Sequence, residues 1–422
     1  MAAVQAYHAR THGTFAKIFG KLVGQSKNKK RAVKNNNDSW FGQVAIRSYM
    51  VMPGQAVWMD RDYTQFAQEA YIRNVIAHRS VDMIATAAAS VPLILNMVTS
   101  KGVRRELTDH PVLNILKRPN PTQPMGDFFK ALYHYRLISG NAFVQAVGTT
   151  NNTSPTELYL LRPDRVAVIA GKGILPTGYR YSIGEKYIDF PVDRLTGKSR
   201  LLHIKNFHPL NDWYGLSPIE AAAYSIDQHN HSGAWNQALL QNGARPSGAL
   251  IVRNDSGNGG TLSEDQYNRV KLQIDEQFVG AANAGRPLLL EGGLDWKEMS
   301  LTPKDMDFVE AKNSSARDIA LAFGVPPQLL GIPGDNRYSN LQEARVALWE
   351  QTVLPLVMCT VDALNSWLLP MFGDKMELVA DADNITALAV RNQVIWDRVE
   401  RATFLTDDEK RAAVGYGPKK PN

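Results

Sequence analysis

The 422-residue sequence has very little cysteine, with Cys359 as its single thiol. One cysteine excludes an intramolecular disulfide bond and any metal cluster that is built on several thiolates. Because Cys359 lies in the apolar segment LPLVMCTVDAL, we expect it to be buried and to pack as a small apolar side chain. The lack of a disulfide framework is typical of proteins from reducing, intracellular compartments.

Long apolar runs are missing as well. No segment approaches the roughly 20 consecutive apolar residues that a membrane-spanning helix needs, so we expect no membrane partner. The N-terminal segment FAKIFGKLVG is short and charged and lacks a cleavage context, which does not fit a secretory signal. Hydrophobic residues make up 44% of the chain and charged residues 21%, as expected for a soluble protein with a sizeable core.

Recognisable catalytic motifs are also absent. The sequence contains neither a GxSxG nor an HExxH motif. The segment GKS at 197–199 resembles the end of a phosphate-binding loop, but Val192 stands where that loop needs its first glycine. His229 and His231 are two residues apart on an expected helix, so they point to different faces. We therefore expect no enzyme activity, no catalytic residues, no metal site and no cofactor.

One enzymatic alternative rests on the acidic segment DADN at 381–384. Asp381 and Asp383 carry carboxylates of the kind that bind divalent cations. A metal-dependent hydrolase that processes DNA would use them, and it would be active as a monomer or dimer. The apolar residues around this segment favour an edge strand that is followed by a solvated turn.

The net charge of +6 is concentrated at the N-terminus. Residues 1–40 hold eight Lys and Arg residues against Asp38 alone, which makes this arm +7 and leaves −1 for the rest of the chain. The arm lacks apolar periodicity, so we expect it to be disordered. A body that grips nucleic acid through many phosphate contacts should be basic, so this body is expected to meet DNA only loosely.

Residues 41–216 are predicted to form an α+β domain. A helical spacing of apolar residues begins at Tyr71 and ends before Pro92, and another helix follows Pro124 and ends near Gly140. Strands are predicted for the segments AFVQAV, LYLLRPDRVAVIA, GYRYSIG and LLHIKNF, which are separated by turns.

The next part is predicted to begin with a long helix over residues 217–243. Ser217 is its expected N-cap, Pro218 occupies the first turn, and Glu220 completes a capping box. A second helix of similar length is predicted over residues 302–324, ending at Gly324 and the two prolines that follow.

Between these helices, residues 244–301 predict a small α/β module. It combines a strand SGALIV, a helix with a capping box of Ser263 and Gln266, and a hairpin with a Gly-Gly turn. Two long helices that bracket a small module describe a stalk with the module at its tip.

The segment GVPPQLLGIPGDNRYSN, residues 324–340, forms an unusually long and proline-rich connection. Loops longer than about 12–15 residues are uncommon in compact regions and are often functional. Ser339 and Gln342 are expected to cap the next helix, which Pro355 should kink. A further strand completes residues 341–384, and the helical residues 385–422 include a cap at Thr406.

The order of these parts resembles the portal proteins of long-tailed double-stranded DNA bacteriophages and of related prophages or gene transfer agents. The segments YGLSPIEAA, NGARPSG and AFGVPPQLLG carry the resemblance, which covers residues from about 60 to 420. The resemblance implies an α+β portal fold that assembles as a ring around a central channel. Its parts would be a basic arm (1–40), a wing (41–216), two stem helices (217–243 and 302–324), a clip (244–301), a tunnel loop (325–340), a kinked helix with a strand (341–384) and a helical crown (385–422).

The resemblance further implies a structural rather than enzymatic role. Such a protein forms a dodecameric ring at one capsid vertex, through which DNA is packaged and later ejected, although isolated portals also form rings of other sizes. Its partners are other copies of itself, the large terminase subunit, a head–tail connector or adaptor, the major capsid protein and the passing double-stranded DNA. The protein would reside in the virion after assembly in the bacterial cytoplasm. Another ring-forming head–tail adaptor remains an alternative, although such chains are usually much shorter.

Two sets of site residues follow from the resemblance. The tunnel loop would line the channel with hydrogen-bonding groups and a single opposed charge pair, through Asp335, Asn336, Arg337, Tyr338, Ser339 and Asn340. The clip would dock the terminase and then the connector through polar residues of its helix, namely Glu264, Asp265, Tyr267, Arg269 and Lys271.

Overall fold

The computed structural model describes twelve segments of the chain, all within its larger compact unit, Val51–Asn422. The expected basic arm at 1–40 lies outside the described residues. The described segments are 62–98, 104–148, 154–171, 175–241, 248–252, 263–278, 294–298, 308–333, 338–373, 375–382, 385–388 and 396–413.

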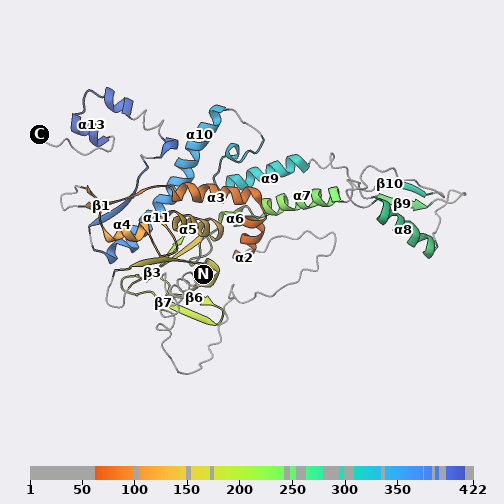
Figure 1. The fold of residues 1–422 in the computed structure, drawn as a ribbon, viewed down its shortest axis with the longest axis horizontal. Coiled ribbons are helices and arrows are strands. Elements are labelled where there is room, and N and C mark those ends of the chain that lie inside the picture. Colours follow the sequence, from red (N-terminus) through yellow and green to blue (C-terminus); the bar gives the residue numbers. More distant parts are fainter. Residues whose placement is uncertain are drawn as a thin grey trace, which may run out of the picture. The chain divides into compact units, whose positions relative to one another are not determined.

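The helices of the first domain pack on one another around α3 and α5 (Figure 1). Asn74 begins α3, because its side-chain oxygen accepts from the backbone N–H groups of Ile76 and Ala77. The π-helical turn before Asn74 was not predicted from the sequence. The elements are α2 (Tyr63–Gln65), η1 (Phe66–Ile72), α3 (Val75–Ala89), α4 (Pro111–Lys117) and α5 (Met125–Ser139).

Four small antiparallel sheets cover the described strands. The predicted strands AFVQAV and LLHIKNF become neighbours, β3 and β8, although about 50 residues separate them in the chain. The sheets are β11-β1-β2 (Met376–Ala380, Leu93–Val98, Arg104–Leu107), β4-β3-β8 (Glu157–Leu161, Asn141–Val147, Leu201–Lys205), β5-β6-β7 (Val166–Ile169, Gly178–Ile183, Lys186–Pro191) and β10-β9 (Leu294–Glu298, Gly248–Val252).

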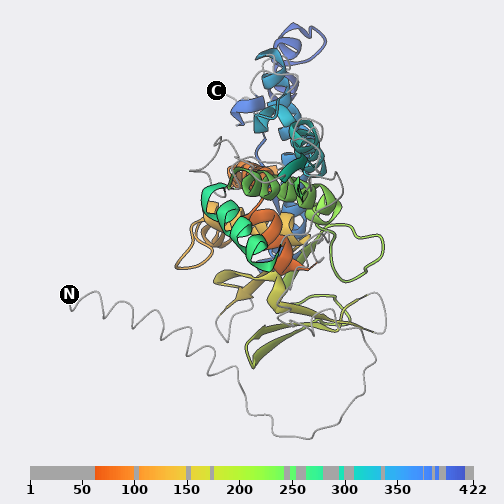
Figure 2. The ribbon, with the colours of Figure 1, turned by 90° about the vertical axis from the view of Figure 1, so that its right-hand side faces the viewer.

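The strands lie against the helices and against each other (Figure 2). Two separate clusters of buried side chains fill these contacts. The larger cluster joins the helices to the β3 sheet, with Leu132, Val144 and Leu158 fully buried. The smaller cluster lies between the β3 and β6 sheets and contains Phe143 and Phe190. The expected edge strand before Asp381 is confirmed, since β11 pairs with β1 at one end of its described sheet.

The sequence predicts a kink or a broken backbone hydrogen bond at Pro355, and the helix changes type directly before this residue. α10 (Tyr338–Leu348) continues into a π-helical segment η5 (Trp349–Val353), followed by α11 (Leu354–Trp367) and η6 (Leu369–Met371). The Leu354 N–H donates to the Trp349 carbonyl five residues back, so the α-helical pattern is interrupted one residue before the proline.

This continuous helical stretch, Asn340–Met371, is long and apolar enough by composition to span a membrane. Half of its apolar window is buried inside the protein, and Val357, Leu364 and Leu368 belong to the main core. The stretch therefore has the burial pattern of a core helix.

The expected burial of Cys359 is wrong, because its side chain is exposed. Val357, Val361 and Leu364 turn one face of α11 into the core, and Cys359 lies on the opposite side of the helix. The apolar residues around Cys359 in the sequence do not reveal which face of α11 carries its thiol. The remaining short helices are η2 (Pro163–Arg165), η4 (Pro327–Leu330), η7 (Thr386–Leu388) and α13 (Asp407–Ala413), and the expected cap of α13 at Thr406 is confirmed.

Candidate functional site: the paired stem helices and their attachments

The stem begins with two helices instead of the single predicted one. α6 (Pro218–Ala221) ends at Ala222, and α7 (Ala223–Gln241) continues from there. Ser217 is the N-cap as predicted, but its hydroxyl accepts from the Ile219 N–H and donates to the Ile138 carbonyl at the end of α5. The cap therefore anchors the stem to the preceding domain and does not form the expected reciprocal bond with Glu220.

α7 and α9 (Phe308–Ala322) lie side by side and run antiparallel (Figure 1). Near the start of α7, the Ser225 hydroxyl donates to Asp318 of α9 at 3.4 Å. One turn further along α7, His229 lies near Lys312 of α9, whose charge lowers the pKa of His229. The residue numbers of these contacts rise along α7 and fall along α9, so the two helices run antiparallel. The first residues of the predicted second helix, Thr302 among them, lie outside the described residues.

A buried polar cluster holds α7 against α3. The Asn74 side-chain amide lies 2.9 Å from Asn230 Oδ1 and 3.2 Å from His229 Nδ1, and Asn230 donates to the Glu69 carbonyl. Burial lowers the pKa of His229, and the positive charge of Lys312 lowers it further. The neutral imidazole of His229 is therefore part of the packing between α7 and α3.

α9 ends in a turn that contains two glycines with positive φ angles. Gly324 adopts φ +67°, and its carbonyl accepts from the Thr352 hydroxyl at 2.7 Å. η4 follows, Gly331 again has a positive φ of 70°, and the buried Ile332 packs on Ala316 and Ala320 of α9. The prolines and glycines of GVPPQLLG thus fold the chain back onto the stem before the polar part of the loop begins.

The structure changes the limits of the predicted tunnel loop. Tyr338, Ser339 and Asn340 form the first turn of α10, so Ser339 is not the N-cap of this helix. Ser339 and Gln342 have the spacing of a capping box, but α10 begins one residue before Ser339, at Tyr338. Asp335, Asn336 and Arg337 lie outside the described residues.

The small module between α7 and α9 contains β9, β10 and α8 (Glu264–Phe278). The predicted capping box of α8 is confirmed, because Ser263 N–H donates to Gln266 Oε1 at 3.0 Å and Gln266 N–H donates to Ser263 Oγ at 3.4 Å. β10 pairs with β9, and the predicted Gly-Gly hairpin turn lies outside the described residues. The proposed docking residues all lie on the first two turns of α8 and are exposed, namely Glu264, Asp265, Tyr267, Arg269 and Lys271.

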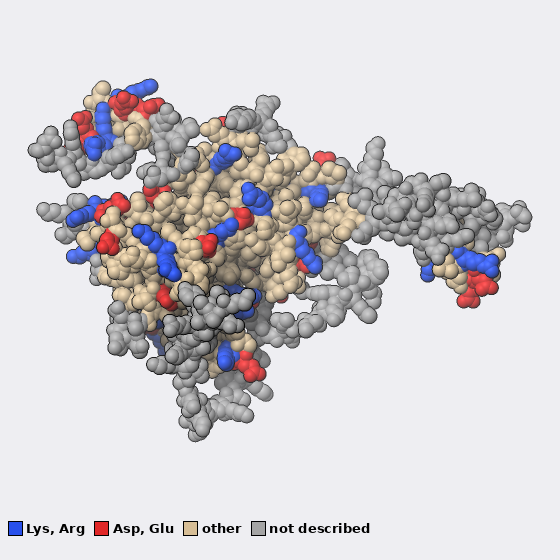
Figure 3. Space-filling view, viewed as in Figure 1, with Lys and Arg blue, Asp and Glu red and all other residues tan. Residues whose placement is uncertain are grey.

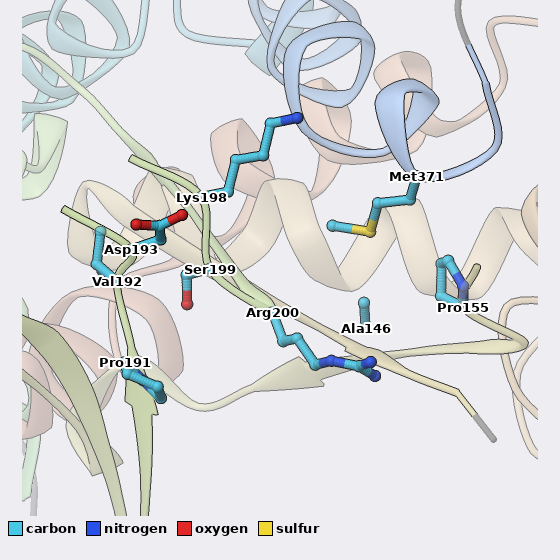
Figure 4. Close-up of a pocket in the computed structure, with 9 residues that line it drawn as sticks. All are labelled: Ala146, Pro155, Pro191, Val192, Asp193, Lys198, Ser199, Arg200 and Met371. Atoms are coloured by element: carbon cyan, nitrogen blue, oxygen red, sulfur yellow. The ribbon is translucent and has the colours of Figure 1, made fainter. Parts of the chain in front are cut away.

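A pocket of about 380 Å³ lies beside the segment GKS at 197–199 (Figure 4). The turn residues Pro191 to Asp193 line one side, and Ala146, Pro155 and Met371 line the other. Asp193 is occupied by hydrogen bonds from Leu195 and Thr196 within its own turn. The turn connects strand β7 to strand β8 and opens no helix, so it lacks the geometry of a phosphate-binding loop.

The described residues also contain no group of three or more His, Cys, Asp or Glu side chains that is able to hold a metal ion. Asp381 follows β11 and donates its backbone N–H to the Pro92 carbonyl, whereas Asp383 lies outside the described residues. The metal-dependent hydrolase is therefore not favoured.

Local sequence patterns did not identify the polar residues that join distant elements of the fold. Asn74 is buried and Asn230 is half-buried, and they bond to each other between α3 and α7. Arg136 is also buried, and it joins α5 to α11. An asparagine directly before a helical apolar pattern was the one available signal, and it pointed to the cap at Asn74 alone.

Comparison with known proteins agrees with this arrangement. The sequence model of the phage portal protein family matches residues 76–415. The portal protein of Enterobacteria phage HK97 is 24% identical over 364 residues, which cover 85% of this chain and 78% of that protein.

Solved structures extend the comparison. A chain in the neck of a native gene transfer agent (GTA) particle, computed with C12 symmetry, is 43% identical, covers 87% of this chain and 96% of that chain, and superposes with a TM-score of 0.65. An HK97-family phage portal protein from Corynebacterium diphtheriae is 16% identical, covers 80% of this chain and 98% of that chain, and shows the same fold with a TM-score of 0.55. The chain therefore belongs to the phage portal protein family and has its α+β fold.

Proposed function

We propose that this chain is the subunit of a dodecameric portal ring at one vertex of a phage-like or gene transfer agent particle, and that DNA enters and leaves through its channel. The observation that carries this proposal is the family match combined with a 43% identical chain in the neck of a GTA particle that was computed with C12 symmetry. The role is structural, and ATP hydrolysis during packaging belongs to the terminase partner. Assembly takes place in the bacterial cytoplasm before the ring becomes part of the particle.

The stem supports a ring in physical terms. A closed ring of identical subunits needs two different faces on each subunit, because its contacts are heterologous. The α7–α9 pair exposes residues along both helices, among them Tyr224 on α7 and Val309 and Leu321 on α9. Large apolar side chains at these positions favour burial against a neighbouring subunit.

The charge distribution suits a channel past which DNA slides. Lys and Arg side chains are interspersed with Asp and Glu over the described part of the face in Figure 3, with no continuous basic stripe there. Each phosphate that a protein neutralises adds to affinity, so a strongly basic wall would hold the DNA in place. A near-neutral body avoids this braking effect.

The exposed first turns of α8 are proposed to dock the large terminase subunit during packaging and a head–tail connector afterwards. Charged groups of both signs stand next to Tyr267, whose side chain is 58% exposed, and such an aromatic side chain is well suited to an interface. The wing would contact the major capsid protein. Asp335, Asn336 and Arg337, together with the first turn of α10, are proposed to face the DNA.

Native mass spectrometry and negative-stain microscopy of the purified chain test the ring. We expect twelve-fold rings with a central channel, and rings with another subunit count would still support a portal. A compact monomer or dimer at micromolar concentration, or metal-dependent nuclease activity, would overturn the proposal.

Replacement of Asp335–Arg337 by Gly-Ser-Gly tests the channel loop. The α10 helix and the Gly324 turn remain, so we expect rings of normal size whose particles package less DNA or retain it poorly. The matched control replaces Arg194–Thr196, in the exposed turn before β8, in the same way. Packaging and retention at the level of the unchanged chain would refute a role of the loop on DNA.

A further inference from the structure

Arg136 of α5 is a buried cation without an acidic partner among the described residues. Its residue is 7% exposed, and its guanidinium donates to three neutral oxygens, namely Asn206 Oδ1 at 2.9 Å, Thr360 Oγ1 at 3.1 Å and the Leu356 carbonyl at 3.3 Å. The neighbouring Cys359 thiol also interacts with it. The three bonds to oxygen use Nε and Nη1. Arginine is almost never buried without a partner of opposite charge, so this site calls for an anionic group from outside the described chain.

On one side, Arg136 contacts a loop that presents apolar side chains to solvent. Phe207 directly follows Asn206 and is 84% exposed, and Leu210 is 92% exposed. The loop is held by its own hydrogen bonds, since the Leu210 N–H donates to His208 and the Asn206 amide donates to the Leu216 carbonyl. An ordered loop that exposes two large apolar side chains loses little conformational entropy when a partner covers them.

On the other side, Arg136 contacts α11 where this helix is open to solvent. Leu356 and Thr360 flank Met358, which is 50% exposed, and Cys359, which is exposed. The thiol lies close enough to the guanidinium to interact with it. Thus Arg136 links two exposed apolar segments that are about 150 residues apart in the chain.

We propose that Arg136, Phe207, Leu210, Met358 and Cys359 form one surface that receives the neighbouring copy of this chain in the ring. This surface is called the Arg136 surface below, and its assignment rests on the proposed ring. Apolar side chains around a guanidinium match the composition of protein interfaces, in which aromatic residues, Met and Arg are enriched.

Charge complementarity favours a second copy as the occupant. Glu310 on α9 and Glu343 on α10 are exposed carboxylates that take part in no ion pair among the described residues. The same chain therefore carries both the unpaired guanidinium and acidic groups of the kind that pair with it. A heterologous interface brings different faces of identical chains together, as such a pairing requires.

The chain carries its own probe, because Cys359 is its single cysteine. A bulky maleimide, such as a polyethylene glycol maleimide, reports on this surface alone. We expect the rate of labelling to fall at least tenfold when the unassembled chain is compared with the purified ring. Equal rates in both forms, or a thiol already protected in the unassembled chain, would overturn the inference.

A double variant, Phe207→Ser with Leu210→Ser, tests the same surface without touching the core. We expect the protein concentration needed for rings to rise at least tenfold, while thermal unfolding of the unassembled chain stays unchanged. The matched control is Leu195→Ser, which alters a 96% exposed leucine in the turn before β8 and should leave assembly intact. Normal assembly of the double variant would contradict the assignment.

A further variant, Arg136→Gln, tests the ion pair and should weaken assembly about threefold or more if its unassembled chain unfolds normally. If its fold is disturbed, the labelling and the double variant decide the question.

These outcomes separate the inference from the proposed function. If the unchanged chain forms no rings, the proposed function fails. If it forms rings in which Cys359 reacts freely, only the Arg136 surface is wrong. Protection of Cys359 that appears only after DNA is added would place this surface at the channel and would equally overturn its assignment to a neighbouring subunit.

Discussion

At the scale of single residues, buried polar side chains join parts of the fold that are distant in sequence. Asn141 Oδ1 accepts from the Gly215 N–H at 2.7 Å and lies 2.9 Å from His203 Nε2. Since the backbone N–H identifies this Asn141 atom as an acceptor, His203 must donate from Nε2. Although the whole residue is only half-buried, its ring stacks on Phe143 with centroids 4.3 Å apart, and burial lowers the pKa of His203 to about 3.

This pKa predicts a pH dependence of stability. Between about pH 3 and pH 6.5, His203 is protonated in the unfolded chain but not in the folded chain, so the unfolded chain binds more protons. The stability contribution of neutral His203 is therefore complete above pH 6.5 and is lost as the pH falls, by up to about 1.4 kcal/mol per pH unit. Denaturant unfolding of the unassembled chain from pH 7 to pH 4 measures this slope.

The matched variant is His203→Gln, which keeps a donor for Asn141 but does not titrate in this range. Other histidines titrate in both proteins, so the comparison of the two slopes isolates His203. Identical slopes would show that the imidazole is protonated as easily in the folded chain as in the unfolded one.

At the scale of elements, the stem joins the end of α5 at a point where the backbones of Gly140 and Gly215 are in close contact. Gly140 ends α5 with φ +74°, and a Cβ built on it would lie 2.4 Å from the Gly215 carbonyl oxygen. A Cβ on Gly215 would lie 2.2 Å from the Gly140 carbonyl oxygen. Two residues later, the Ser217 hydroxyl donates to the Ile138 carbonyl at the end of α5. Gly215 of the motif YGLSPIEAA therefore allows the two backbones to approach closely, and the hydrogen bond of Ser217 holds them together.

The variant Gly215→Ala should therefore destabilise the chain strongly, by about 3 kcal/mol or more, because the clash is with backbone atoms that are held on both sides. Thermal or denaturant unfolding measures the loss. Gly126→Ala is the control within the first turn of α5, where an added Cβ meets nothing within 4 Å. This change should leave stability unchanged or raise it by up to about 1 kcal/mol. Similar effects of both substitutions would refute the role of this close contact.

At the scale of the whole molecule, the net positive charge is concentrated at the N-terminal end of the sequence. Residues 1–40 carry +7, and the rest of the chain carries −1. In the described residues, several cations are already paired, for example Arg180 with Asp189 at 2.7 Å and Arg104 with Glu377 at 3.0 Å. The basic isoelectric point of about 9.1 therefore describes the arm and says little about how the body meets DNA.

We expect the purified full chain to bind duplex DNA with a marked salt dependence that disappears when residues 1–40 are deleted. The slope of log affinity against log salt is about −0.9 for each phosphate neutralised, so loss of the arm should bring it close to zero. Fluorescence anisotropy at 50 and 200 mM salt measures both proteins, with ring formation as the control for folding. An unchanged slope after deletion would place the DNA contacts on the body.

Sequence predictions that depend on neighbouring residues were mostly correct, and predictions that depend on tertiary packing were less accurate. The capping boxes at Ser263 and Thr406 and the interruption near Pro355 were correct, because each depends on residues within one or two helical turns. The prediction for Ser339 was wrong because the same local pattern also fits inside a helix that starts earlier. The prediction for Cys359 was wrong because burial depends on which face of α11 meets the core.

By itself, the sequence determined the order of helices and strands, the stops at Gly324 and its prolines, and the concentration of positive charge in residues 1–40. These properties follow from backbone propensity, capping and composition, which neighbouring residues set. The tertiary structure alone decided that β3 pairs with β8, that Asn74 holds the stem through His229 and Asn230, and that Arg136 lies buried between an exposed loop and α11. Such contacts join residues from about 60 to more than 200 positions apart, and only packing of the folded chain brings them within hydrogen-bonding distance.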